Sequence, residues 1–346
     1  MSLSEIAGII ASLPLETGHL DEVYDAVASS SANGYDEEYM MSDLFESPGA
    51  GVGDTRTRAS AYGRPLRDLF KDYLNDRALT RGGSAEVEDY IRRLAESDIQ
   101  IYWPYSENWD GKSFPIVTFD PGYGADSNYG YVIKPGGDGK AFVSDSVFVD
   151  EKVAMERPVW VINTNDDSKL KPMLISDDEA GVKSSGGEEG KTRLILKSIS
   201  MLRNYDSWFG GASEFWIKIG AVDGFKASDD KDLLLYSPSV TDFFIVIKRK
   251  QMGLSVPVNS IMLTDFTDQM EKLAFLVTED DGGEMTNWKA SAVVKYNSKQ
   301  YGFDVTIPYK DKDDIVWRGT LDASFFKKDA VTSGRFGDVK LYFELR

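Results

Sequence analysis

Two acidic residues flank a glycine pair in the C-terminal half of the chain. Asp206 precedes Gly210–Gly211, and Glu214 follows them. In residues 214–219, EFWIKI, polar or bulky side chains then alternate with apolar ones. This period of two is typical of a half-buried strand. The glycine pair is typical of a turn that leads into such a strand. We expect the turn to bring both carboxylates close together, where like charges repel unless a cation lies between them.

A second acidic segment offers partners for the first. Glu279, Asp280 and Asp281 directly follow an apolar run that ends at Val277. Calcium binds six to eight oxygens at roughly 2.3–2.6 Å, from carboxylates, carbonyls and water. The candidate metal ligands are Asp206, Glu214, Glu279 and Asp281, with Glu284 in reserve. The alternative is that these acids are solvated on separate turns.

Composition excludes several classes of site. The chain has 346 residues, with 57 acidic and 39 basic side chains and a formal charge of −18. This charge argues against nucleic acid and bare anionic membranes as partners. No cysteine is present, which excludes disulfides and thiolate metal sites. The single histidine, His19, argues against a Ser–His–Asp triad and a multi-histidine zinc site, and it is expected to be structural.

The N-terminal third has the apolar period of helices. Residues 20–27, 66–74 and 87–94 each repeat apolar positions at i, i+3, i+4 and i+7. Residues 1–98 are therefore predicted to form a helical N-terminal region. Between these patterns, the glycine-rich stretch 47–54 lacks both the preceding strand and the Gly-Lys-Ser/Thr of a phosphate-binding loop, which predicts an extended loop.

From residue 99 the pattern changes to short strands, which predicts a small all-β domain over residues 99–180. Its stretch 102–111, YWPYSENWDG, is rich in aromatic residues. We consider Tyr102, Trp103, Tyr105 and Trp109 as a sugar-stacking platform, with burial in the core as the favoured alternative. The acidic, Gly/Ser-rich segment 176–191 is the strongest linker candidate.

Residues 192–346 contain eight or nine predicted strands and no helical crossover, a pattern typical of an antiparallel sandwich. The fold class predicted for the whole chain is α+β. A helical N-terminal segment precedes mostly antiparallel β structure, which ends in a β-sandwich domain over 192–346.

The segment 198–220 resembles the first calcium loop of C2 domains. In that family a strand ends in a leucine, and an Asp, a glycine and Ser-Asp-Pro-Tyr-Val-Lys follow. This chain has Leu202, Asp206, Gly211 and then SEFWIK at residues 213–218. The resemblance implies a calcium/lipid-binding β-sandwich whose loops hold calcium between Asp206, Glu214 and the acids of a later loop.

Two further segments extend the resemblance to roughly 45% of the chain. Glu279–Asp281 stand where the family places the Asp-x-Asp of its third loop, and residues 336–345 resemble its last strand. The chain departs from the family where Glu replaces Asp at 214 and at 279, and where Phe-Trp replaces Pro-Tyr. These departures bear on calcium ligation more than on the fold. Trp208 and Phe209, between the first two acids, are candidates for membrane insertion.

The function expected from these patterns is that of a non-enzymatic binding or assembly protein with a calcium-dependent C2-like domain. Its expected partner is a protein or a glycan at the cell envelope, and membrane binding is expected only with calcium. Residues 34–45 and the aromatic β segments resemble secreted bacterial proteins, which favours an extracytoplasmic location after removal of a signal, with a cytoplasmic location as the alternative. The alternative functions are carbohydrate binding through residues 102–109 and hydrolysis by a carboxylate pair.

Overall fold

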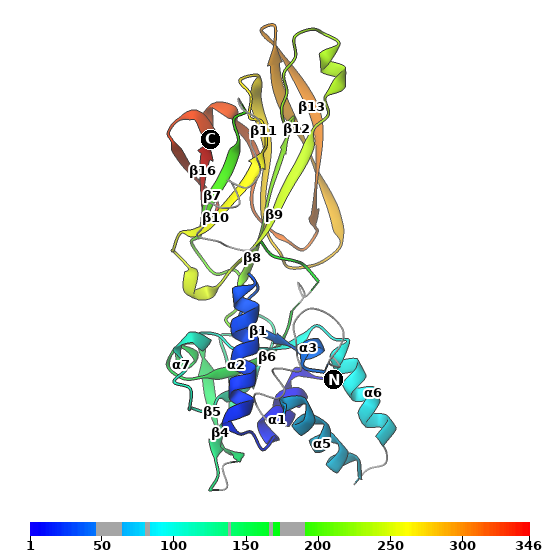
Figure 1. Cartoon of the computed structure of the whole chain (residues 1–346), viewed down its shortest axis with the longest axis vertical. Coiled ribbons are helices and arrows are strands. Elements are labelled where there is room, and N and C mark those ends of the chain that lie inside the picture. Colours follow the sequence, from blue (N-terminus) through cyan, green and yellow to red (C-terminus); the bar gives the residue numbers. More distant parts are fainter. Residues whose placement is uncertain (46–63, 80–83, 138–139, 166–168, 174–190) are drawn as a thin grey trace. The chain divides into compact units, whose positions relative to one another are not determined.

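The computed structural model describes residues 1–45, 64–79, 84–137, 140–165, 169–173 and 191–346 (Figure 1). The chain forms two compact units, one of residues 1–168 with 206–211 and one of residues 169–205 with 212–346. The glycine-rich stretch 47–54 lies outside the described residues. The same is true of the predicted linker 176–191, apart from Lys191.

Within the described residues, the α-helices all lie in the first unit. They are α1 (Leu3–Ser12), α2 (Thr17–Ala32), α3 (Met41–Phe45), α5 (Leu66–Leu79), α6 (Ser84–Ala95) and α7 (Glu151–Glu156). The N-cap of α1 is Ser2, whose side chain accepts a hydrogen bond from the Glu5 backbone N–H. Three helices coincide with the predicted helical patterns, so the apolar period of 20–27, 66–74 and 87–94 is confirmed.

A six-stranded sheet accompanies these helices. Its strands are β1 (Glu38–Met40), β2 (Ile99–Tyr102), β3 (Ile116–Phe119), β4 (Ser127–Pro135), β5 (Ala141–Asp150) and β6 (Val159–Thr164), and a 3-10 turn spans Ser106–Asn108. The spatial order is β1-β2-β6-β3-β4-β5. All neighbours are antiparallel except β3 and β6, which are parallel.

The boundary predicted between residues 98 and 99 does not separate compact units. One apolar core contains Ile6 and Ile10 of α1 together with Ile101, Val117 and Trp160 of the sheet. Strand β1 lies inside the region predicted to be helical and pairs with β2. The helices and strands form one unit because the apolar faces of the helices and one apolar face of the sheet cover each other.

The second unit is built from two antiparallel sheets. Its strands are β7 (Leu194–Met201), β8 (Ser213–Ala221), β9 (Ser239–Ile247), β10 (Val256–Leu263), β11 (Met270–Glu279), β12 (Met285–Tyr296), β13 (Lys299–Lys310), β14 (Asp314–Asp322), β15 (Val331–Phe336) and β16 (Val339–Leu345). Short 3-10 turns span Asp232–Leu235, Arg249–Gln251 and Ala323–Lys327. The orders are β10-β7-β16-β15 and β13-β12-β11-β8-β9, with β14 also paired to β11.

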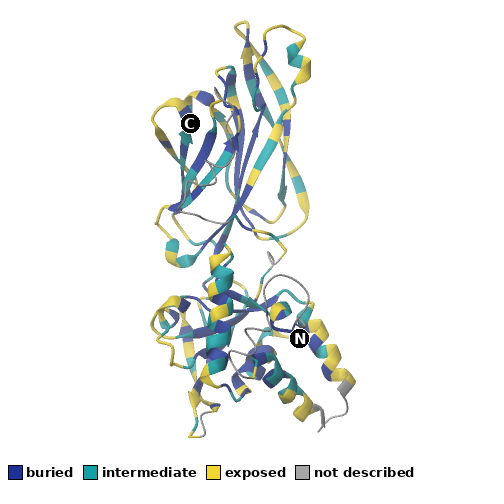
Figure 2. Cartoon of the chain, viewed as in Figure 1, coloured by how far each residue is buried: buried dark blue, intermediate teal, exposed yellow. Residues whose placement is uncertain are grey.

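Both sheets of the second unit contribute to one core. Leu196 and Leu341 from the first sheet lie in the same buried cluster as Phe215 and Phe275 from the second. Buried residues, dark blue in Figure 2, run along strands of both sheets. The predicted α+β class and the antiparallel strands of the C-terminal half are thereby confirmed. The described part of this unit has ten strands, where eight or nine were predicted.

The β12–β13 hairpin pairs with β11 only near Met270 and Lys272, and it then folds over the face of its own sheet that carries Ala274 and Leu276. A side-chain carbon added at Gly220 of β8 would overlap Val305 of β13, so the missing side chain permits this close approach. Lys218, on the polar side of the EFWIKI alternation, is consequently 5% exposed and donates to the Pro308 carbonyl at 2.7 Å. Burial lowers the pKa of Lys218.

None of the helices in the described ranges is both long and apolar enough to cross a membrane.

Candidate functional site

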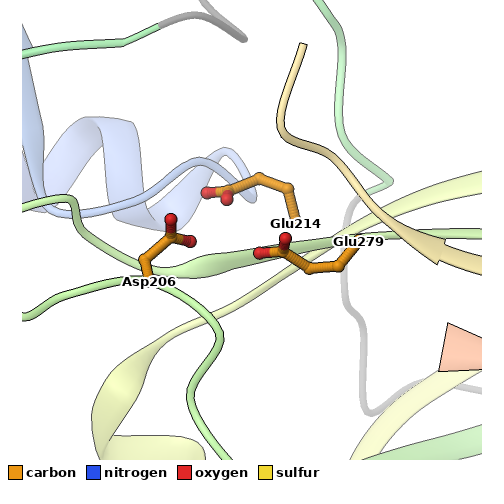
Figure 3. Close-up of side chains that lie close together, drawn as sticks. All are labelled: Asp206, Glu214 and Glu279. Atoms are coloured by element: carbon orange, nitrogen blue, oxygen red, sulfur yellow. The ribbon is translucent and has the colours of Figure 1, made fainter. Parts of the chain in front are cut away.

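Three of the predicted metal ligands converge. Asp206, Glu214 and Glu279 each place one carboxylate oxygen within 4.8 Å of the other two, and Figure 3 shows the three side chains around a common space. Among the described residues, no other group of three or more acidic or histidine side chains is spaced this closely. It contains acids from both of the segments that the sequence singled out.

The strand register places the two glutamates together. Glu279 is the last residue of β11 and lies opposite Phe215 of β8, the residue after Glu214. The Asp280 N–H donates to the Glu214 carbonyl at 2.8 Å, which holds the end of β11 against the start of β8. Glu279 is 1% exposed, whereas Asp206 and Glu214 are half-buried.

The glycine pair shapes the loop that carries Asp206. The Gly210 N–H donates to the Ser207 carbonyl at 3.0 Å, and Gly211 has a φ of +126°, a backbone conformation that favours glycine. A side-chain carbon at Gly211 would also lie 2.8 Å from a carboxylate oxygen of Asp36. The Tyr205 N–H donates to Ser213 Oγ at 3.0 Å and closes the loop. The two glycines therefore allow the tight turn that brings the chain back toward Asp206.

The spacing of the carboxylates fits a calcium ion. Two oxygens bound to one ion at roughly 2.3–2.6 Å lie at most about 5 Å apart, and the three carboxylates meet that limit. Carboxylate oxygens are the ligands that calcium prefers. Asp206, Glu214 and Glu279 could supply three ligands, and backbone carbonyls and water would complete the shell.

The other predicted ligands lie outside this group. Asp281 and Glu284 are exposed, in the loop between β11 and β12. The Glu284 N–H donates to Asp311 Oδ1 at 2.9 Å. A role for Asp281 or Glu284 in calcium binding stays a prediction.

The middle acid of this segment, Asp280, has a structural role that the sequence did not indicate. Its carboxylate accepts bonds from Lys310 Nζ at 2.6 and 2.8 Å and from Trp216 Nε1 at 2.9 Å. The Gly282 N–H adds a further bond at 2.9 Å. Burial acts to raise the pKa of Asp280, but these hydrogen bonds outweigh it and hold the pKa below its ordinary value. Asp280 thus anchors the loop that follows Glu279.

The predicted sugar-stacking platform does not form. Tyr102 and Trp103 are each 1% exposed, so their ring faces are not accessible to a sugar. The Tyr105 hydroxyl donates to Glu151 at 2.8 Å, and the Trp109 ring packs on Trp103 with centroids 5.3 Å apart. The alternative, burial in the core, holds for both residues, since Trp103 packs in the core shared with the helices and Tyr102 packs in a second apolar cluster of the same sheet.

The two aromatic residues considered for membrane insertion are also buried. Trp208 is 3% and Phe209 0% exposed. Trp208 Nε1 donates to the Asp126 carbonyl at 2.9 Å, and the Phe209 carbonyl accepts from Asn163 at 2.8 Å. Both rings belong to an apolar cluster that includes Tyr102, so the prediction that they insert into a membrane is wrong.

A buried acidic stretch in the first unit was not singled out in the sequence. Asp36, Glu37 and Glu38 are 6%, 4% and 7% exposed. Glu38 accepts from Asn165 Nδ2 at 2.6 Å. Burial and then the neighbouring charge of Asp36 raise the pKa of Glu38 to about 8. In the sequence, the stretch could have been recognised as three consecutive acids directly before the strand residues Tyr39 and Met40.

Comparison with known proteins adds no relative. No family model matches the chain, and neither a curated protein nor a solved structure matches it.

Proposed function

We propose that this chain is a non-enzymatic binding protein whose C-terminal sheets form a C2-like sandwich that holds calcium. The convergence of Asp206, Glu214 and Glu279 is the observation that carries the proposal. The bound ion would connect the loop before β8 with the end of β11. We further propose that the protein works outside the cytoplasm, where it binds a protein or glycan partner at the cell envelope.

The donor set favours calcium over the other common metals. All three side chains offer oxygen, and the chain has no cysteine and one histidine, so the soft and imidazole ligands that zinc and copper prefer are not available here. Magnesium requires near-octahedral geometry and keeps several waters, whereas calcium accepts irregular oxygen shells. Extracellular calcium modules bind in the range of roughly 0.1–1 mM, which suits a site with three carboxylates.

The three carboxylates define what the protein contributes to such a site. Glu214 and Glu279 are held side by side by the β11–β8 pairing. This pairing sets the positions of the two glutamates before the ion arrives, so little ordering of these two side chains is needed on binding. A divalent cation would reduce the mutual repulsion of the three carboxylates, and its remaining coordination positions could accept an anionic group of a partner.

Thermal unfolding in calcium and in chelator tests the proposal. An ion that binds only the folded state at 100 times its dissociation constant stabilises it by about 2.7 kcal/mol. For a unit of this size the gain corresponds to an increase in Tm of about 5–10 °C. Glu214→Gln combined with Asp206→Asn should abolish the response and should raise the Tm in chelator by relieving repulsion.

The matched control is Asp304→Asn, which neutralises an exposed acid on β13 away from the three carboxylates. This variant should retain the full calcium response. Adding Asp281→Asn to the series shows whether Asp281 contributes, since its loss would then reduce the affinity. Superimposable melting curves of the unmodified protein in calcium and in chelator would eliminate the metal site.

A further inference from the structure

A small cavity lies in the first unit, at the N-terminal end of α2. Its volume is about 180 Å³, and its polar lining consists of Glu16, His19, Arg64 and Lys140. Leu69 of α5 and Pro14 contribute apolar walls. Sites for drug-sized ligands usually measure about 300–1,000 Å³, so this cavity suits a smaller ligand.

The buried floor of the cavity is the only histidine of the chain. His19 is 4% exposed, and its Nδ1 accepts the Glu16 N–H at 2.9 Å. Burial lowers the pKa of His19 below 6.5, although the Glu16 and Arg64 backbones act in the opposite direction. The ring is therefore neutral at neutral pH, and because Nδ1 accepts, the proton resides on Nε2.

The Nε2–H group of His19 is a donor that needs an acceptor. Within the described residues Nε2 is buried and has no hydrogen-bond partner. A buried donor that lacks its acceptor costs about 1–3 kcal/mol, so such a group in the wall of a cavity points to a ligand. The ligand must present an acceptor atom to the ring.

The hairpin between β4 and β5 brings a cation to the cavity. The Ala141 N–H donates to the Leu15 carbonyl at 2.8 Å, which holds the start of β5 beside the loop that precedes α2. Lys140, the residue before Ala141, is exposed and lines the cavity. This backbone bond sets the lysine close to His19 although the two are far apart in the sequence.

A second cation comes from the start of α5. The Leu66 N–H donates to Glu22 of α2 at 2.8 Å, which fixes the beginning of α5 against α2. Arg64 lies two residues earlier and lines the cavity. Its Nη2 pairs with Asp72 and contacts the Asp68 carbonyl, so one part of the guanidinium is held while other N–H groups remain as donors.

The charges around the cavity favour an anion. Two cationic side chains line the cavity together with the carboxylate of Glu16, and Arg64 also pairs with Asp72. The N-terminus of a 16-residue helix adds a partial positive charge. Guanidinium, ammonium and imidazole N–H groups at one helix N-terminus are the donors that phosphate oxygens accept.

We propose that this cavity, lined by His19, Arg64 and Lys140, binds a small oxyanion, either free phosphate or the phosphate group of a monoester. The His19 Nε2–H donates to one oxygen from the buried side, and the two cations bind the remaining oxygens at the exposed side. The site is independent of the calcium proposal, since it uses none of the carboxylates at residues 206, 214 and 279.

Nuclear magnetic resonance of the imidazole tests this site without ambiguity of assignment, because the chain has one histidine. Inorganic phosphate, phenyl phosphate and acetate are titrated separately at constant ionic strength against chloride. Phosphate is expected to shift the His19 ring signals saturably and to raise the His19 pKa, since an anion stabilises the imidazolium. A tighter response to phenyl phosphate than to phosphate would identify a monoester as the source, and the reverse order would identify free phosphate.

Variants of the exposed lining residues complete the test. Arg64→Met and Lys140→Met should each weaken phosphate binding about tenfold, because each removes a charge-assisted hydrogen bond. Glu16→Gln should tighten it. Lys134→Met, which removes another exposed lysine of the same hairpin, is the matched control and should bind as the unmodified protein does. A His19 signal that phosphate does not shift, that acetate or chloride shifts equally, or whose shift survives both cation variants would overturn the proposal.

Discussion

Glu38 provides a stability prediction that can be worked through quantitatively. It is 7% exposed on β1, and burial followed by the charge of Asp36 raises its pKa to about 8 from an ordinary value of 4.5. The folded protein therefore keeps Glu38 protonated between these two pH values, whereas the unfolded chain releases the proton. The stability contributed by the neutral carboxyl is fully present below pH 4.5 and is lost as the pH rises through about 8.

The size of this effect follows from the difference between the two pKa values. One pKa unit corresponds to about 1.4 kcal/mol, so the full difference is on the order of 5 kcal/mol before the structure relaxes around the charge. Glu38→Gln removes the titration and keeps one oxygen, which can accept from Asn165, while its amide NH2 can donate to the Ser30 hydroxyl oxygen. At pH 9 the free energy of unfolding of the variant should exceed that of the unmodified protein by about 2–5 kcal/mol. Near pH 4 the two should agree.

Urea unfolding at pH 4, 7 and 9, followed by tryptophan fluorescence, measures this difference. Glu88→Gln on the exposed side of α6 is the matched control and should show no such pH-dependent gain. An equal effect of Glu38→Gln at all three pH values, or destabilisation at pH 9, would refute the reasoning, because either result means that Glu38 is not protonated in the folded state at neutral pH.

Two further substitutions probe the second unit. Lys310→Met should lower the free energy of unfolding by about 3 kcal/mol, because it leaves the buried Asp280 carboxylate without its cation; adding Asp280→Asn should recover part of the loss in urea unfolding, and full additivity of the two changes would contradict the pairing. Gly220→Ala should cost about 1–3 kcal/mol by overlap with Val305, and Val305→Ala should rescue it in a thermal melt if the close approach of β13 to β8 is the cause.

Local pattern was sufficient to predict the elements and the direction of their apolar faces. The apolar residues of EFWIKI, Phe215, Ile217 and Ile219, are all fully buried in one core, as the period of two requires. The helical period of residues 20–27 likewise corresponds to the buried face of α2. These features are local because side-chain direction repeats with the backbone geometry of each element. The acids that flank Gly210–Gly211 could be identified for the same reason, since a turn brings its ends together.

Tertiary structure decided which layer covers each face and which loops meet. Lys218 is buried because the β12–β13 hairpin covers it. Trp103 is buried in the core that the N-terminal helices share with the sheet, whereas Tyr102 is buried in the cluster with Trp208 and Phe209. Three consecutive acids have three different environments. The pairing of β8 with β11 places Glu279 beside Glu214 in the acidic group, Asp280 forms an ion pair with Lys310, and Asp281 is exposed. The cavity at His19 is formed by three segments that are distant in the sequence. The Ala141 N–H donates to the Leu15 carbonyl and the Leu66 N–H donates to the Glu22 carboxylate, and these hydrogen bonds hold the segments together. Such contacts depend on long-range pairing, which no local period encodes.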